Sequence, residues 1–266
     1  MKPIASYYDF TGKVVVITGG SRGIGHAMAL AFATAGAKVA VASRKIESCE
    51  ATVKEIRALG SDGSAHRVHV GSWKDCDRLA EEVFAKWGRA DVLINNAGLS
   101  PLASSSLETS EELFDKIIAV NLKGPFRLTA LFASRMVAGD GGAVINISST
   151  TSIRPDPETA PYGAAKAGLN ILTVACAKEY GPKVRVNCIM CGPFHTDISK
   201  GWSRTGDFTA RAKQTFPLQR AGEPEEAVGA AMYFASPAAS FTTGAVLIVD
   251  GGSSNPLART VYESRD

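Results

Sequence analysis

The chain has 266 residues, of which 45% are hydrophobic and 21% charged, and its formal net charge is +3. This length suffices for one α/β domain with a full core, and the small net charge excludes a strongly basic nucleic-acid-binding surface. No apolar run is long enough to cross a bilayer, and the N-terminus lacks a signal-peptide pattern. We therefore expect a cytoplasmic protein that binds neither nucleic acid nor membranes.

Short apolar runs alternate with helical patterns along the whole chain. The expected strands span residues 14–18, 39–42, 65–70, 92–94, 143–147, 184–189 and 246–249. Such alternation predicts an α/β fold, a doubly wound parallel sheet of about seven strands with helices on both faces. No repeat or linker divides the chain, which predicts a single domain over 1–266, with 1–11 as an N-terminal extension and 253–266 as a C-terminal tail.

The segment Thr18-Gly-Gly-Ser-Arg-Gly-Ile-Gly25 directly follows the first expected strand. A strand that turns straight into a helix needs residues that tolerate unusual φ and lack a Cβ, and Gly19, Gly23 and Gly25 meet that need. The first backbone N–H groups of the helix would face a dinucleotide pyrophosphate, although the spacing is G-x-x-x-G-x-G rather than G-x-G-x-x-G. The apolar stripe expected on this helix is Ile24, Ala27, Met28, Ala31, Phe32 and Ala35.

The end of the second expected strand bears on the choice between NAD and NADP. An acidic residue there would bind the ribose hydroxyls and repel a 2′-phosphate. This chain instead has Ser43 followed by Arg44, and Arg22 lies in the glycine-rich segment. Both guanidinium groups can pair with a dianionic phosphate, so the sequence predicts NADP(H) in preference to NAD(H).

The histidines and cysteines form no convincing ligand set, so we expect no metal site. His66 and His69 are predicted to lie along the third strand. Cys188 and Cys191 form the only C-x-x-C, predicted in a strand and the loop after it rather than at a helix start, which argues against a redox motif. The next helix after the histidines has a clear apolar stripe, formed by Cys76, Leu79, Ala80, Val83, Phe84 and Trp87.

Tyr162 and Lys166 are four residues apart in an expected helix, and Ser149 ends an expected strand thirteen residues before the tyrosine. Residues at i and i+4 share one helix face, so the lysine ammonium can lie near the phenol and lower its pKa. A tyrosine with a lowered pKa can transfer protons near neutral pH.

Together these residues resemble the short-chain dehydrogenase/reductase family, and the resemblance extends from about Gly12 to Gly252. Other segments that match the family in order are Asn95-Asn-Ala-Gly98, Val120-Asn-Leu-Lys-Gly124, Asn146-Ile-Ser-Ser149 and Asp250-Gly-Gly252. The resemblance implies a Rossmann fold and reversible hydride transfer between a nicotinamide cofactor and a carbonyl carbon. Within the family it is similar to 3-oxoacyl-carrier-protein reductases and NADP-dependent carbonyl reductases.

The resemblance also implies four catalytic residues. Tyr162 would give its proton to the carbonyl oxygen, and Ser149 would hydrogen-bond the same oxygen. Lys166 would lower the pKa of the tyrosine and bond the nicotinamide ribose. Asn121 would shape a helix irregularity and hold a water that relays protons to Lys166.

Further cofactor contacts follow from the same resemblance. Besides the residues named above, they are Ser21, Ile24, Val70, Asn95, Ala97, Gly98, Val120, Gly192 and Thr196. Two residues depart from the family pattern: Cys191 stands where proline is usual, and His69 stands where an aspartate commonly contacts adenine. Neither departure removes a reacting group, so both concern cofactor affinity.

Residues 194–217 are expected to fold over the substrate as a lid. The apolar residues of this segment are Phe194, Ile198, Trp202, Phe208 and Phe216. The loop 150–158 would form the opposite wall, with Arg154 expected to face solvent. A scaffold of this kind does not name its substrate.

Several functions therefore stay open. The favoured one interconverts a ketone and a secondary alcohol, and a reductase of 3-oxoacyl thioesters of an acyl carrier protein or coenzyme A is the nearest alternative. A catalytically silent NADP-binding regulatory protein and a sugar-nucleotide epimerase or dehydratase are the others. The resemblance implies a homotetramer, with a homodimer as fallback, through the helices that begin near Glu111 and Tyr162 and through the last strand.

Overall fold

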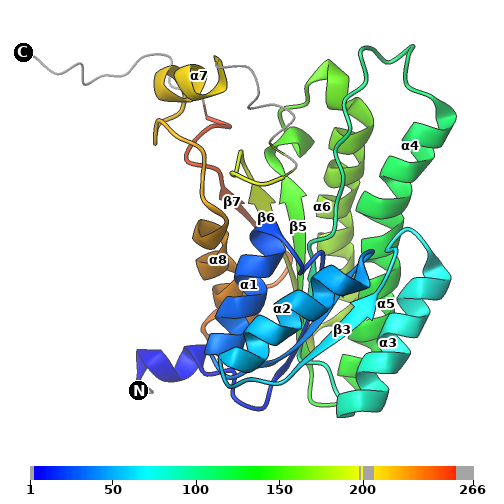
Figure 1. Ribbon diagram of the computed structural model, residues 1–266, viewed down its shortest axis with the longest axis vertical. Helices are drawn as coiled ribbons and strands as arrows, with labels where there is room; N and C mark the ends of the chain where they lie inside the picture. The colour runs from blue at the N-terminus through cyan, green and yellow to red at the C-terminus, as the bar shows by residue number, and fades with distance from the viewer. Residues whose placement is uncertain (1–2, 198, 200–206, 256–266) are drawn as a thin grey trace, which may run out of the picture.

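Seven parallel strands form one sheet, in the order β3-β2-β1-β4-β5-β6-β7, in the computed structural model of the protein, which describes residues 3–197, 199 and 207–255 (Figure 1). This confirms the predicted doubly wound sheet. The strands are β1 (Val14–Thr18), β2 (Lys38–Ser43), β3 (Gly63–Arg67), β4 (Val92–Asn95), β5 (Gly142–Ser149), β6 (Val184–Cys191) and β7 (Val246–Val249).

Helices cover both faces of the sheet. Helices α1, α2 and α8 pack on one face and α3, α5 and α6 on the other. The α-helices are α1 (Gly23–Thr34), α2 (Ile46–Ala58), α3 (Trp73–Trp87), α4 (Glu111–Ile118), α5 (Gly124–Ala138), α6 (Ala160–Tyr180), α7 (Asp207–Thr215) and α8 (Val228–Ala235). Shorter helical segments are the 3-10 turns η1 (Ile4–Tyr8), η3 (Thr150–Ser152), η4 (Pro157–Thr159), η6 (Pro224–Ala227) and η7 (Pro237–Ala239), and the π-helical segment η2 (Ala119–Lys123).

The apolar runs and stripes of the sequence form the core. Every residue of β1 is buried, as expected for a parallel strand covered on both faces. On α3, the predicted stripe faces the sheet, and Ser72 begins the helix by accepting a hydrogen bond from the Asp75 backbone N–H. Among the described residues, no helix combines the length and the apolar character needed to span a membrane.

The third strand is shorter than predicted and starts earlier in the chain. Strand β3 ends at Arg67 rather than residue 70, because its ladder partner β2 ends at Ser43, opposite Arg67. After one more backbone bond, from Val68 N–H to the Ser43 carbonyl, the chain turns at His69 toward α3. The prediction that His69 lies in a strand is therefore wrong, whereas His66 does lie in β3.

The buried face of α1 is rotated relative to the predicted stripe. Its buried residues include Ala29 and Ala33 in place of Ala27, Ala31 and Ala35. The rotation follows from the glycine loop, because the backbone of Gly25 is held against Gly19 at the start of the helix. The predicted buried positions Met28 and Phe32 are confirmed.

Packing begins inside the predicted N-terminal extension. The η1 turn contains no buried residue, but Phe10 is buried and its ring lies 4.9 Å from that of Phe32, edge to face. The strand order reverses between β1 and β4, and the crevice beyond the carboxyl ends of such strands is where ligands bind. In Figure 1, α7 lies above the carboxyl ends of β5 and β6.

Candidate active site

The glycine-rich loop between β1 and α1 forms one side of a cleft of about 580 Å³. Gly19 and Gly23 have φ values of +66° and +53°, which favour glycine. A Cβ on Gly25 would lie 2.3 Å from the Gly19 carbonyl oxygen, so only glycine lets the helix approach the loop. Helix α1 has no side-chain cap, which leaves its first N–H groups available to an anion such as a phosphate.

Most of the predicted site residues line this one cleft, although they come from distant parts of the chain. They are Gly19, Ser21, Arg22, Gly23, Ile24, Ser43, Arg44, Val70, Ala97, Gly98, Val120, Ser149, Tyr162, Lys166, Gly192 and Thr196. Their convergence reflects the topology, because most of them lie at or just after the carboxyl end of a strand.

Asn95 does not line the cleft. It is the last residue of β4 and 1% exposed, and its amide donates hydrogen bonds to Asn146 Oδ1 at 2.9 Å and Thr129 Oγ1 at 3.1 Å. Its side chain therefore belongs to the core rather than to a cofactor contact. The next residue, Asn96, faces the cleft and donates to the backbone oxygens of Thr18 and Gly19. Sequence reasoning missed this residue, although strand alternation places neighbours on opposite faces.

Asn121 lies behind the cleft, in the π-helical segment η2, so the predicted helix irregularity is present. The residue is fully buried, and its amide donates to the backbone oxygens of Leu99 and Ile117. A Cβ on Gly98 would lie 3.0 Å from Asn121 Oδ1 and 3.7 Å from Lys166 Nζ. Gly98 therefore lies close to both the Asn121 amide and the Lys166 ammonium, where a larger side chain would be crowded.

Tyr162, Lys166 and Ser149 meet at the end of β5. Lys166 is 3% exposed, and its Nζ donates to the Ile147 carbonyl at 2.7 Å. The same Nζ lies 5.7 Å from the centroid of the Tyr162 ring. Ser149 Oγ is held by Thr151, to whose Oγ1 it donates at 3.1 Å.

Burial dominates the protonation of this group. It raises the pKa of Tyr162 to about 12, against a smaller opposite effect of the Ser149 hydrogen bond, and lowers the pKa of Lys166 to about 8. The expected lowering of the tyrosine pKa, by Lys166 together with the positive nicotinamide of the oxidised cofactor, is not seen in the protein alone, where burial has the larger effect. The lysine lies beside the tyrosine ring. Both groups lose hydration on burial, and their interaction with each other does not compensate for this loss.

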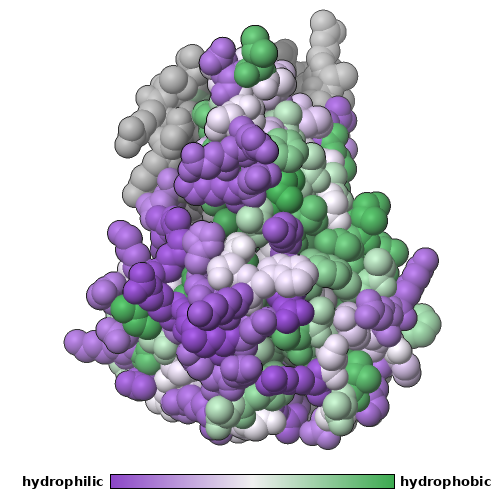
Figure 2. All heavy atoms as spheres, turned by 90° about the vertical axis from the view of Figure 1, so that its right-hand side faces the viewer, coloured by the Kyte–Doolittle hydropathy of each residue, from purple (hydrophilic) through white to green (hydrophobic). Residues whose placement is uncertain are grey.

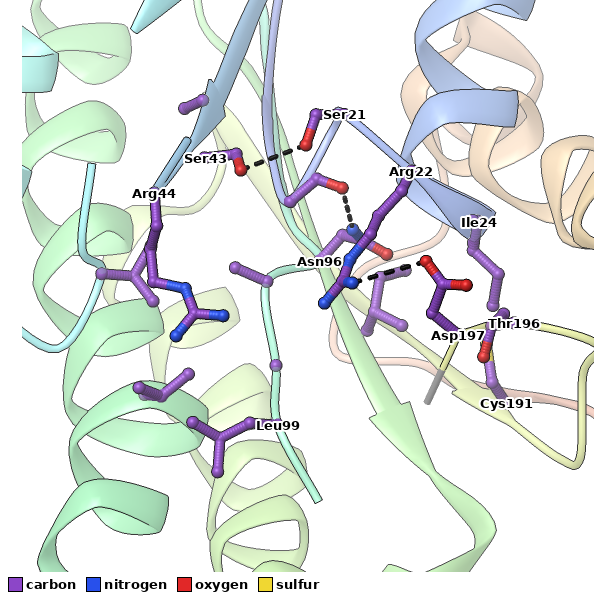
Figure 3. Close-up of a pocket in the computed structure, with 18 of the residues that line it drawn as sticks. Ser21, Arg22, Ile24, Ser43, Arg44, Asn96, Leu99, Cys191, Thr196 and Asp197 are labelled. Carbon is purple, nitrogen blue, oxygen red and sulfur yellow. Dashed lines mark hydrogen bonds and ion pairs between the residues drawn. The ribbon is translucent and has the colours of Figure 1, made fainter. Parts of the chain in front are cut away.

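At the far end of the cleft, polar side chains lie around the carboxyl end of β2 (Figure 3). Ser21 Oγ donates to Ser43 Oγ at 3.1 Å, which ties the glycine loop to β2. Arg22 pairs with Asp197 at 3.4 Å, and both residues are exposed. Arg44 makes no ion pair or side-chain hydrogen bond with the part of the chain that the structure describes.

Two family departures border the cleft. Cys191 ends β6 rather than lying in the loop after it, which corrects the predicted position. Burial raises its pKa to about 12, so the thiol stays protonated. His69, the second departure, also lines the cleft. Lys45 and Val68 line it too and were not predicted; of these two, only the basic Lys45, next to Arg44, carried a signal in the sequence.

A second cavity of about 850 Å³ shares Ser149 and Gly192 with the cleft. The predicted lid residues Phe208 and Phe216 line it, whereas Ile198 and Trp202 lie outside the described residues. Arg154 lines it as well and is exposed, in agreement with the expectation that its loop forms a wall and that its side chain faces solvent. Within the described chain, no three His, Cys, Asp or Glu side chains are grouped to hold a metal ion.

Ser254, at the start of the predicted tail, also lines the second cavity and was not predicted. The Asp250 carboxylate positions it by accepting hydrogen bonds from the backbone N–H groups of Gly252 and Ser254. Pro217 packs against Gly252, so closely that a Cβ there would lie 2.5 Å from the proline ring. The turn after β7 thus reaches back over the site.

Known proteins resemble this chain over almost its whole length. A family model described as enoyl-(acyl carrier protein) reductase matches residues 19–254. The chain is 36% identical over 242 residues to a 3-oxoacyl-(acyl-carrier-protein) reductase from Thermotoga maritima, covering 91% of this chain and 97% of that protein.

Solved structures agree. A short-chain type dehydrogenase/reductase from Mycobacterium marinum superposes with a TM-score of 0.89 at 32% identity, covering 96% of this chain and all of that one. A candidate NAD(P)-dependent gluconate 5-dehydrogenase from Beutenbergia cavernae, with bound NADP, gives 0.88 at 32% identity, covering 93% and 98%. The chain therefore belongs to the short-chain dehydrogenase/reductase family of oxidoreductases, which bind a nicotinamide cofactor.

Proposed function

We propose that the protein interconverts a ketone and a secondary alcohol with NADP(H). The observation that carries this proposal is the position of Ser149, which lines both the cofactor cleft and the second cavity, with Tyr162 beside it in the cleft. The cleft fits a dinucleotide, because the glycine cradle and the uncapped start of α1 leave room and N–H donors for a pyrophosphate. When bound there, the nicotinamide supplies or accepts the hydride.

The proton chemistry belongs to the chain's own residues. Burial raises the pKa of Tyr162, so the phenol keeps its proton at neutral pH and is in the form that can donate to a carbonyl oxygen. Ser149 hydrogen-bonds the same oxygen and orients it while negative charge develops. In this proposal Lys166 and Asn121, which both lie close to Gly98, return a proton toward the tyrosine through water.

The proposed preference for NADP(H) over NAD(H) is supported by the end of β2. Ser43 offers no carboxylate that would repel a 2′-phosphate. Arg44 lines the cleft without an ion partner among the described residues, so it is the better phosphate ligand, whereas Arg22 must first leave Asp197. The NADP-containing relative is consistent with this choice.

A second candidate is reduction of 3-oxoacyl thioesters, which the Thermotoga maritima relative favours. It would use the same residues on a different substrate. A silent NADP-binding protein is the alternative from another class, and the complete set of Ser149, Tyr162, Lys166 and Asn121 argues against it.

The test is consumption of NADPH, followed by absorbance, with a panel of ketones and acyl thioesters. We expect turnover by the native protein and a loss of about 100-fold or more in Tyr162→Phe, with NADPH affinity unchanged by calorimetry. Turnover of Tyr162→Phe within a few fold of the native protein would contradict the role of proton donor. NADPH binding without any turnover would favour the silent protein.

We also propose a homotetramer. Exposed apolar residues, Phe114 on α4, Phe126 on α5, and Ile171 and Val174 on α6, lie on helices that contact one another. Figure 2 shows hydrophobic side chains gathered on part of this side of the molecule. Residues 246–248 of the edge strand β7 are also exposed. Light scattering should give about four times the 27.9 kDa chain mass, and a monomer mass would refute the proposal.

A further inference from the structure

Ser149 caps the 3-10 turn η3, and Thr151 in that turn contacts the serine side chain twice. The backbone N–H of Thr151 donates to Ser149 Oγ at 3.2 Å, and Ser149 Oγ donates to Thr151 Oγ1 at 3.1 Å. Thr151 Oγ1 has no other side-chain hydrogen-bond partner in the part of the chain that the structure describes. A residue two positions further along the chain therefore sets the direction of the serine hydroxyl.

The position of Thr151 is fixed from the side of α6. Its carbonyl oxygen and its methyl group lie against Gly163, where a Cβ would approach them to 3.0 Å and 3.4 Å. The next residue, Ser152, accepts a hydrogen bond from Asn170 Nδ2 on the same helix at 3.0 Å. Helix α6 also carries Tyr162, so the turn and the proposed proton donor are held in one rigid frame.

The serine hydroxyl has one proton to donate and two lone pairs with which to accept. In the structure Ser149 donates this proton to Thr151 Oγ1, and Tyr162 is a further hydrogen-bond partner of the serine. The proposed reduction needs the same proton on the carbonyl oxygen of the ketone. The Ser149 hydroxyl must therefore turn from Thr151 to the ketone.

The Thr151 hydroxyl can then reverse its role, because a hydroxyl group both donates and accepts. Once Ser149 donates to the ketone, Thr151 Oγ1 donates to Ser149 Oγ beside the Thr151 backbone N–H. The serine oxygen then accepts two hydrogen bonds and donates one, which satisfies its whole capacity. A hydroxyl that accepts hydrogen bonds donates more strongly, because each bond polarises the next.

We propose that Thr151 is a positioning residue for the reaction, which holds the Ser149 hydroxyl in place and donates to it while negative charge develops on the ketone oxygen. This inference rests on the proposed ketone reduction and adds a residue to it. Both hydroxyls only turn and keep their protons, and the proton that reaches the product oxygen comes from Tyr162. The effect of Thr151 is largest in the transition state, where that oxygen is most negative, so it belongs to kcat rather than KM.

Two substitutions at this one position separate the hydroxyl from the methyl group. Thr151→Val keeps the backbone N–H and the methyl group against Gly163 but removes Oγ1, whereas Thr151→Ser keeps the hydroxyl and removes the methyl group. The probe is ethyl acetoacetate, a small ketone, with NADPH. We expect Thr151→Val to lower kcat about tenfold with KM within about twofold, and Thr151→Ser to keep kcat within about twofold. The affinity for NADPH, measured by calorimetry, should be that of the native protein in both variants.

A double-mutant cycle tests whether Thr151 acts through Ser149. When Thr151→Val is added to Ser149→Ala, kcat should change by less than about twofold, because the group that the threonine positions is already absent. A role of Thr151 in packing, or in direct contact with the ketone, would instead lower kcat by about tenfold in both backgrounds and would rule the inference out.

The outcomes also distinguish this inference from the proposed function. Thr151→Val with the kcat of the native protein overturns the inference and leaves ketone reduction intact. Equal losses of kcat in Thr151→Val and Thr151→Ser, with lowered melting temperatures in both, would show a packing role and contradict it as well. If another ketone of the panel is reduced faster, the same comparison uses that ketone. If the native protein reduces no ketone at all, the proposed function fails and the role of Thr151 with it.

Discussion

The cofactor cleft and the substrate cavity share Ser149 but treat their polar groups in opposite ways. In the cleft, Asn96 bonds the glycine loop and Arg22 bonds Asp197. In the cavity, the side chains of Arg154 and Arg211 are exposed and form no ion pair with the described chain. The cleft is therefore built mostly of backbone and internally paired groups, which suits a ligand that a whole family shares.

This difference indicates which residues can determine substrate specificity. A pyrophosphate is recognised by backbone N–H groups and by space that only glycine provides, so few side chains can vary. The second cavity is lined by side chains on loops and on α7, which can change without disturbing the sheet. The following predictions test each side of this comparison.

The largest effect is expected from Gly25→Ala. The new Cβ would lie 2.3 Å from the Gly19 carbonyl oxygen, so α1 must move away from the loop that it holds. Misplacement of this kind should weaken NADPH binding by at least about 100-fold, measured by calorimetry. Gly229→Ala is the control, because a Cβ there meets no atom within 4 Å, and it should bind NADPH normally. Unchanged affinity in Gly25→Ala would show that the cradle is not needed.

Lys166→Met should raise the free energy of unfolding, because burial of the charged lysine destabilises the folded protein. Burial lowers the lysine pKa from 10.5 to about 8 in the folded chain, so between these values the unfolded chain binds more protons and stability rises with pH. Below pH 8 the whole penalty is present. The variant should therefore gain about 2 to 3 kcal/mol at neutral pH, less whatever the unpaired Ile147 carbonyl costs.

Urea unfolding near pH 7 and near pH 10 measures this prediction. The native protein should become more stable over that interval relative to Lys166→Met, and the gap between the two should close. Lys178→Met, an exposed position on the same helix, should follow the native protein at both values. Parallel pH dependence of the native protein and Lys166→Met would mean that Lys166 is not the titrating group.

Arg44→Asp should reverse the cofactor preference toward NADH. A charge-assisted hydrogen bond to the 2′-phosphate contributes about 1.5 to 3 kcal/mol, equivalent to about 10- to 150-fold in relative efficiency. Lys54→Glu on α2 carries the same change of charge away from the cleft and serves as the control. An unchanged ratio of NADPH to NADH efficiency in Arg44→Asp would remove the support for NADP(H) from this part of the cleft.

Sequence patterns predicted the framework well because they report local constraints. The run 14–18 became β1 within the same bounds, and the stripe of α3 faces the sheet as expected. The β3 boundary was wrong because a strand ends where its neighbour ends, and Ser43 of β2 lies far from Arg67 in sequence. Boundaries of this kind depend on pairing and leave no local signal.

In the candidate site, too, the sequence predicted some residues correctly and others wrongly. Ser149, Tyr162 and Lys166 were found from spacing and family order, and the structure brings them together. Asn95 was assigned to the cofactor, but its side chain turns into the core and Asn96 faces the cleft. A pair of identical neighbouring residues gives the sequence no means of choosing, because the register of β4 decides which of them is buried.

The sequence by itself determined the sheet, the glycine loop and the choice of Ser149, Tyr162 and Lys166 as candidate reacting groups, because periodicity, glycine positions and residue chemistry act over a few neighbouring residues. Only the tertiary structure decided the protonation of Tyr162 and the lining of the substrate cavity. The tyrosine pKa depends on hydration lost to distant segments. Ser254 lines the second cavity because Asp250 holds the turn after β7, and no local sequence pattern places it beside Ser100 and Ser149.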